Sequence, residues 1–99
     1  MNEAGFERYA IFLDKIPGRE ASRETILRHV EHLKTLDAQG RLVLCGPFTD
    51  APGGLVVIRA ESKAEAEAAA QADPFVREGA RAARVVTWLL ACAENGYLA

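Results

Sequence analysis

Hydrophobic and polar positions alternate along this chain in two different periods. Short segments rich in branched and aromatic residues, bounded by glycine or proline, are typical of β-strands. Longer segments whose apolar positions recur every three or four residues are typical of helices. The sequence therefore predicts four strands, over residues 8–14, 41–48, 55–60 and 83–91.

The two predicted helices begin at serines, which commonly cap helices. Ser22 can cap a helix that runs to about Gln39, and Gly40 is suited to end it. Ser62 and Glu65 match a capping box before an alanine-rich helix.

The elements follow one another as β-α-β-β-α-β, an order that predicts an α+β, ferredoxin-like subunit with a four-stranded antiparallel sheet. In the last strand, Val85 and Leu89 lie on one face while Val86 and Trp88 lie on the other. Both faces are apolar, but two helices can cover only one of them. We therefore expect a homodimer with sheets packed face to face.

Size and composition describe one domain over residues 1–99. The net charge of −2 and the interrupted arginine cluster of Arg77, Arg81 and Arg84 argue against nucleic acid as the main partner. No apolar stretch approaches the ~20 residues of a membrane span, and the first residues do not resemble a signal peptide. We expect a cytoplasmic protein without membrane partners.

The cysteines and histidines do not form a recognisable metal pattern. Cys45 and Cys92 are expected to be buried thiols rather than a disulfide. There is no CxxC or HxxxH spacing, and His29 and His32 lack a second ligand pair. The sequence predicts neither a metal nor another cofactor.

His29 is the histidine expected to face the sheet. On a helical wheel it lies at the edge of a buried stripe formed by Ile26, Leu27, Val30, Leu33 and Leu36, whereas His32 lies beyond it in solvent. An imidazole with its ordinary pKa of about 6.5 can act as a general acid or base. The alternative is a structural histidine bonded to a backbone carbonyl.

Asp73 is the candidate partner of this histidine. An aspartate before Pro74 is suited to cap a short helical turn that ends at Gly79. A carboxylate held in this way can also orient an imidazole and stabilise its charged form, so the two roles are compatible.

Loop and aromatic residues supply candidate substrate contacts. Glycines allow a backbone to approach a ligand closely. Aromatic side chains can wall an apolar pocket, although core packing is the alternative for each. The candidates are Gly46, Pro47, Phe48, Gly53, Gly54 and Phe75.

The chain resembles the YciI-like, or YCII-related, family. The resemblance runs from the first strand to Trp88 and rests on HVEHLKTLDAQGRLVLCGP, on the GG loop before the third strand and on DPFVREG. The helical histidine of that pattern falls on His29, and the aspartate of its DPF motif falls on Asp73.

This resemblance implies a dimeric α+β barrel in which the two side chains form the active site. The family is similar to enzymes that act on aromatic-ring degradation products, one of them with a dehydrochlorinase-like activity. Lactone isomerases share the wider barrel architecture. His32 matches no obligatory family position.

Two functions stay open on the sequence. The first is a small cofactor-independent enzyme, of lyase, isomerase or dehydrochlorinase type, that uses His29 and Asp73 for proton transfer on a small polar organic substrate. The second is a dimeric, non-catalytic module that binds a metabolite or a partner. Assembly beyond the dimer is also compatible with the sequence. A haem or flavin monooxygenase has no cofactor motif to support it.

Overall fold

The computed structural model describes the backbone of residues 3–98 and the side chains of residues 5–98. Two short 3-10 turns, Glu3–Phe6 and Ala93–Asn95, lie at the ends of the described chain. Between them the elements are β1 (Glu7–Lys15), α1 (Arg23–Ala38), β2 (Leu42–Pro47), β3 (Gly54–Ile58), α2 (Lys63–Ala72), α3 (Pro74–Arg77) and β4 (Arg81–Leu89).

The four strands form one antiparallel sheet in the order β2-β3-β1-β4. This order confirms the predicted α+β, ferredoxin-like subunit. Tyr9 of β1 lies opposite Ile58 of β3 and Thr87 of β4, which fixes the register at the centre of the sheet. The pairing of β2 with β3 is irregular between Leu42 and Leu44.

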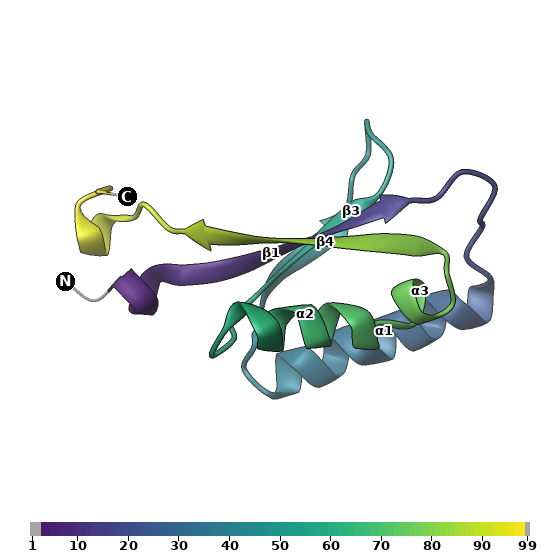
Figure 1. Ribbon diagram of the computed structural model, residues 1–99, viewed down its shortest axis with the longest axis horizontal. Coiled ribbons are helices and arrows are strands. Elements are labelled where there is room, and N and C mark those ends of the chain that lie inside the picture. Colours follow the sequence, from purple (N-terminus) through teal and green to yellow (C-terminus); the bar gives the residue numbers. More distant parts are fainter. Residues whose placement is uncertain (1–2, 99) are drawn as a thin grey trace.

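All three helices lie against the same face of the sheet (Figure 1). The core forms between them and consists mainly of β-branched, aromatic and small side chains. Alanines on α2 allow this helix to approach the sheet closely. The buried cluster contains Tyr9, Ile11, Leu13, Leu36, Val56, Ile58, Ala66, Ala69 and Ala70.

The helix starts follow the predicted caps. The Ser22 hydroxyl accepts a hydrogen bond from the Thr25 N–H at 3.1 Å, and the Ser62 hydroxyl accepts one from the Glu65 N–H at 3.1 Å. The return bond of the second cap differs from a capping box, because the Glu65 carboxylate accepts from the Glu61 N–H. Beyond α1, Gly40 takes a positive φ of 72°.

The predicted buried stripe of α1 is wrong at its start. Leu36 is buried, but Ile26 is 44% exposed and Leu27 is 52% exposed. Ile26 faces a cavity rather than the packed core. The predicted stripe is therefore correct near the end of α1, where the helix contacts the sheet.

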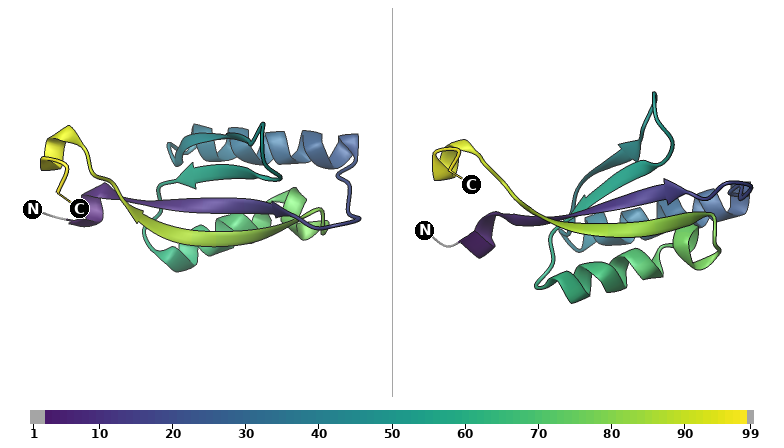
Figure 2. Two further views of the ribbon diagram at one scale, coloured as in Figure 1. Left: turned by 90° about the horizontal axis from the view of Figure 1, so that it is seen from above. Right: turned by 45° about the horizontal axis from the view of Figure 1, so that its top comes forward.

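The segment after β4 is held by side-chain hydrogen bonds. The Asn95 side chain is buried, accepts from the Cys92 N–H at 2.9 Å and donates to the Leu90 carbonyl at 2.7 Å. These bonds fold the segment into a turn. The turn lies at the far end of the β1–β4 pair, beside the start of β1 (Figure 2).

The second face of the sheet has no helix against it within residues 3–98 (Figure 1), and it carries apolar side chains together with the charged pair of Asp14 and Arg84. One row across this face runs through Leu44, Val57, Ala10 and Val86, which are paired strand to strand. Trp88, further along β4, is 47% exposed. No helix in the described chain is long and apolar enough to cross a membrane.

Candidate active site

Asp73 joins two helices and is buried. It ends α2, and its carboxylate caps α3 by accepting a hydrogen bond from the Phe75 N–H at 2.9 Å. Pro74 takes the first position of α3, where no N–H is needed. The DPF sequence thus creates a rigid carboxylate at the junction.

His29 extends from α1 to this carboxylate. Its Nδ1 atom lies 2.8 Å from Oδ1 and 2.9 Å from Oδ2 of Asp73. The His29 side chain is 12% exposed and the Asp73 side chain is 4% exposed. The structure therefore brings together the two residues that the sequence singles out.

The hydrogen-bond partners define which ring nitrogen carries a hydrogen. An ionised carboxylate only accepts hydrogen bonds, so Nδ1 of His29 must donate to Asp73. In the neutral imidazole the second nitrogen, Nε2, then has a free lone pair. This arrangement suits a base in the neutral form and an acid in the protonated form.

The plane of the imidazole is held by Phe75. The two rings are stacked with centroids 3.9 Å apart and an angle of 8° between their planes. Phe75 thus contributes twice, because its N–H bonds to Asp73 while its ring packs on His29. Rotation of the imidazole away from Asp73 would break both contacts.

A second polar contact joins α1 to the segment after α3. Glu78 accepts from the Thr25 hydroxyl at 2.7 Å and forms two hydrogen bonds with the Arg28 guanidinium, at 2.6 and 3.0 Å. The bond from Arg28, helped by that from Thr25, lowers the pKa of the Glu78 carboxyl below its ordinary value. These bonds join α1, which carries His29, to the chain just after the short helix that Asp73 caps.

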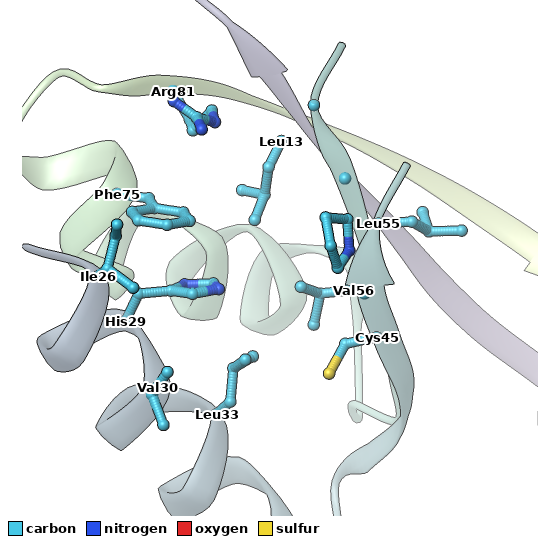
Figure 3. Close-up of a pocket in the computed structure, with 14 residues that line it drawn as sticks. Leu13, Ile26, His29, Val30, Leu33, Cys45, Leu55, Val56, Phe75 and Arg81 are labelled. Atoms are coloured by element: carbon cyan, nitrogen blue, oxygen red, sulfur yellow. The ribbon is translucent and has the colours of Figure 1, made fainter. Parts of the chain in front are cut away.

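The imidazole lies at the wall of a cavity of about 510 Å³ (Figure 3). Its ring extends from α1 into the space between this helix and the β2–β3 pair (Figure 3). The size falls within the range typical of sites for small organic molecules, ~300–1,000 Å³. The apolar part of the lining comes from Leu13, Ile26, Val30, Leu33, Leu55 and Val56.

Most of the predicted substrate-contact residues line this cavity with His29. They are Gly46, Pro47, Gly53, Gly54 and Phe75. Phe48 is not among the lining residues and is 39% exposed, beyond the end of β2. Asp73 stands behind the imidazole rather than in the cavity wall.

Gly53 has a clear structural requirement. Its φ is +85°, and a Cβ atom added there would lie 2.5 Å from the Leu13 carbonyl oxygen. Only glycine permits this approach of the β2–β3 hairpin to β1. The hairpin forms one wall of the cavity, so Gly53 shapes it through the backbone.

Besides apolar side chains, the lining includes a thiol and a guanidinium that the sequence did not identify as parts of a site. Cys45 was expected to be buried, but it is exposed and faces the cavity from the edge strand β2. Arg81, at the start of β4, also lines the cavity. Pairing of Cys45 with Val56 and of Arg81 with Lys15 sets their places, and both pairings depend on strand register.

His32, on α1, was expected in solvent, but its side chain is half-buried. Burial lowers the pKa of its imidazole, while the Asp73 charge opposes this change. His32 does not line the cavity around His29.

No group of three or more histidine, cysteine, aspartate or glutamate side chains suited to a metal ion is found among the described residues. Cys45 and Cys92 are both free thiols. The ionisable side chains that line the cavity are those of His29, Arg81 and Cys45.

Both the sequence and the fold of this chain are similar to those of known proteins. The sequence matches the YCII-related domain over residues 8–89. It is 41% identical over 69 residues to the uncharacterized protein YjpA of Bacillus subtilis (strain 168), covering 70% of this chain and 81% of that protein. The first match agrees with the resemblance in the sequence.

A solved structure extends the comparison to the fold. It is 5-chloro-2-hydroxyhydroquinone dehydrochlorinase from Burkholderia phenoliruptrix AC1100, in complex with 2,5-dihydroxybenzoquinone. The TM-score is 0.62 at 24% sequence identity, over 82% of this chain and 92% of that chain. At this identity the similarity establishes the common fold.

Proposed function

We propose that this chain, which belongs to the family of YCII-related domains, is a small enzyme that needs no cofactor. His29 would give a proton to, or take one from, a small polar organic substrate in the cavity. The observation that carries the proposal is the contact of His29 Nδ1 with both oxygens of the Asp73 carboxylate, at 2.8 and 2.9 Å.

Each neighbour of the imidazole has a role in this reaction. Asp73 holds the Nδ1 hydrogen and stabilises the imidazolium that forms when Nε2 accepts a proton. Phe75 keeps the ring in one plane. The hairpin residues Gly53 and Gly54 would hold the substrate against the ring.

The substrate class is proposed from two observations. The cavity is apolar over most of its lining and has room for an aromatic ring. The dehydrochlorinase with the same fold acts on a chlorinated hydroxyhydroquinone. We therefore place the reaction among steps of aromatic-compound degradation. In an elimination of this type, Nε2 takes one proton, the electron pair of the broken bond to hydrogen forms a new double bond in the substrate, and chloride leaves with the electrons of the C–Cl bond.

The second candidate function is a module that binds a metabolite without converting it. The apolar lining favours this alternative, because such a surface binds a ring through burial alone. The same cavity serves both functions, so the two differ only in what His29 does.

A screen by proton NMR in heavy water separates the two functions. The probes are small hydroxylated ring compounds, including 5-chloro-2-hydroxyhydroquinone. We expect the native protein to catalyse exchange or elimination with at least one probe, and His29→Gln to lose about 100- to 10,000-fold of that rate. His32→Gln, outside the cavity, is the matched control. Probes that bind but never change would favour the binding module.

We further propose that a second copy of the chain covers the open face of the sheet. Leu44, Val86 and Trp88 are each at least two-fifths exposed on that face. An apolar surface of this kind on a sheet is typical of an interface. A second copy brings the same surface and buries both. The mass of the native protein in solution would also measure any assembly beyond this dimer.

A further inference from the structure

Arg81 lacks the carboxylate partner that three other arginines have among the described residues. Arg28, Arg41 and Arg84 each have a carboxylate within salt-bridge distance, at 2.6, 3.3 and 3.2 Å. For Arg81, by contrast, the only hydrogen-bond partner in the described part of the chain is the Ala80 carbonyl, which accepts from Nη1 at 2.8 Å. Since a guanidinium has five N–H donors, most of its capacity is available to a ligand.

The surroundings of Arg81 add positive charge. Lys15 lies directly opposite it in the β1–β4 ladder. The Nη1 atom of Arg19 lies 3.6 Å from the place that a Cβ atom on Gly79 would take. Among residues 5–98 neither Lys15 nor Arg19 has a carboxylate within salt-bridge distance. Like charges opposite one another in a sheet are unfavourable.

Two of the acidic side chains along these strands and turns are already engaged, while Glu20, beside Arg19, is exposed. Asp14, next to Lys15, bonds to Arg84 at 3.2 Å. Glu78, just before Gly79, bonds to Arg28 and Thr25. This end of the sheet therefore carries an excess of positive charge, although the whole chain has a formal charge of −2. A bound anion would relieve the repulsion.

The cation and the imidazole are arranged around one phenyl ring. His29 stacks on Phe75 at 3.9 Å, and the Arg81 guanidinium carbon lies 5.0 Å from the centre of the same ring. Figure 3 shows Phe75 between His29 and Arg81, with all three at the cavity. A ligand that touches both the His29 imidazole and the Arg81 guanidinium must reach about as far as the stack of His29, Phe75 and Arg81 is thick. A molecule of one ring with two substituents has about this length.

We propose that the cavity selects planar ring compounds that carry an anionic oxygen group, and that Arg81 pairs with this group. A phenolate, an enolate and a carboxylate share the required chemistry. The guanidinium positions the ring so that a second polar substituent meets Nε2 of His29. The inference rests on the proposed function in taking the His29 cavity as the substrate site.

Binding of two probes of equal shape tests the inference without any turnover. Benzoate carries the anionic oxygens, and benzamide is its neutral counterpart. Both are titrated by NMR, with the Phe75 and His29 resonances as reporters. We expect benzoate to bind the native protein about tenfold more tightly than benzamide, the usual size of one charge-assisted hydrogen bond.

Substitutions assign the preference to one residue. Arg81→Met keeps the apolar stem and should reduce the ratio of the two affinities to about one. Arg81→Lys should keep part of the preference. Arg77→Met is the matched control, because Arg77 is an exposed cation nearby that does not line the cavity. Arg81→Gln serves in place of Arg81→Met where melting curves reveal a loss of fold.

The outcomes are separable from those of the catalytic screen. A charge preference that survives Arg81→Met overturns the inference, as does a native protein that fails to bind benzoate or binds the two probes equally. Conversion of substrates without a charge preference refutes this inference alone. A charge preference without any conversion supports Arg81 as an anion site and favours the binding module over proton transfer by His29.

Discussion

Nδ1 of His29 lies 2.8 Å from Oδ1 of Asp73, although 44 residues separate the two in sequence. The contact joins the middle of α1 to the junction of α2 and α3. Both residues are fixed before any ligand binds, Asp73 by capping α3 and His29 by stacking on Phe75. This preorganisation is what a proton-transfer site requires.

Asp73→Asn should remove the function of the imidazole while keeping the helix cap. The amide oxygen can still accept from the Phe75 N–H, but the NH2 group then faces Nδ1 and moves the ring hydrogen to Nε2. We expect turnover to fall by about 100- to 10,000-fold, with a smaller change in melting temperature. Asp37→Asn, on an exposed part of α1, is the control. Full activity of Asp73→Asn would refute the orienting role.

Gly53→Ala should destabilise the protein more than a glycine substitution without steric conflict. Gly18 has a φ of +77° and open space around it, so Gly18→Ala should cost about 1 kcal/mol of unfolding free energy. Gly53→Ala adds the 2.5 Å approach to the Leu13 carbonyl, and the cost should rise to about 2–3 kcal/mol. Denaturant titration measures both, and equal costs would contradict this explanation.

The bonds of Glu78 make a pH-dependent contribution to stability. Its pKa lies below the ordinary value of 4.5 in the folded protein, so the contribution is complete above that value. It is lost as the pH falls through the lower, folded pKa. Glu78→Gln should therefore melt at a lower temperature than the native protein near neutral pH, and the two should converge in acid. A difference independent of pH would contradict this effect.

Trp88→Glu should separate the proposed dimer. The substitution places a charge on the open face of the sheet, which the second copy would cover. We expect the native protein to sediment as a dimer and the variant as a monomer. Leu27→Glu is the control, since Leu27 is similarly exposed but lies on α1. A monomeric native protein would rule out the interface.

Much of the fold could be predicted because it depends on local patterns. Ser22 and Ser62 cap their helices, and the β-α-β-β-α-β order leads to one sheet. The helical wheel also placed His29 toward the sheet. Asp73 was identified because an aspartate before proline is suited to cap a short helix and because it falls on the DPF motif of the family.

The remaining parts of the site depend on contacts that a linear pattern does not contain. Cys45 lies among apolar residues in the sequence, which favoured a buried thiol. In the structure it lies on the edge strand β2, where it borders the cavity and is exposed. Arg81 was seen only as one member of a basic cluster. Its position at the cavity follows from the β1–β4 register, which also sets Lys15 opposite it. Phe48 lies one residue past β2, where the chain turns away from the cavity lining.

The most direct test of the central claim is to determine which ring nitrogen of His29 carries the hydrogen. Nitrogen NMR of the labelled imidazole distinguishes the two. The structure predicts that the neutral ring carries its hydrogen on Nδ1, bonded to Asp73, with Nε2 unprotonated and responsive to a ring compound in the cavity. A hydrogen on Nε2 of the neutral ring, or an Nε2 signal that bound ring compounds leave unchanged, would contradict the assignment of His29 as the group that transfers the proton.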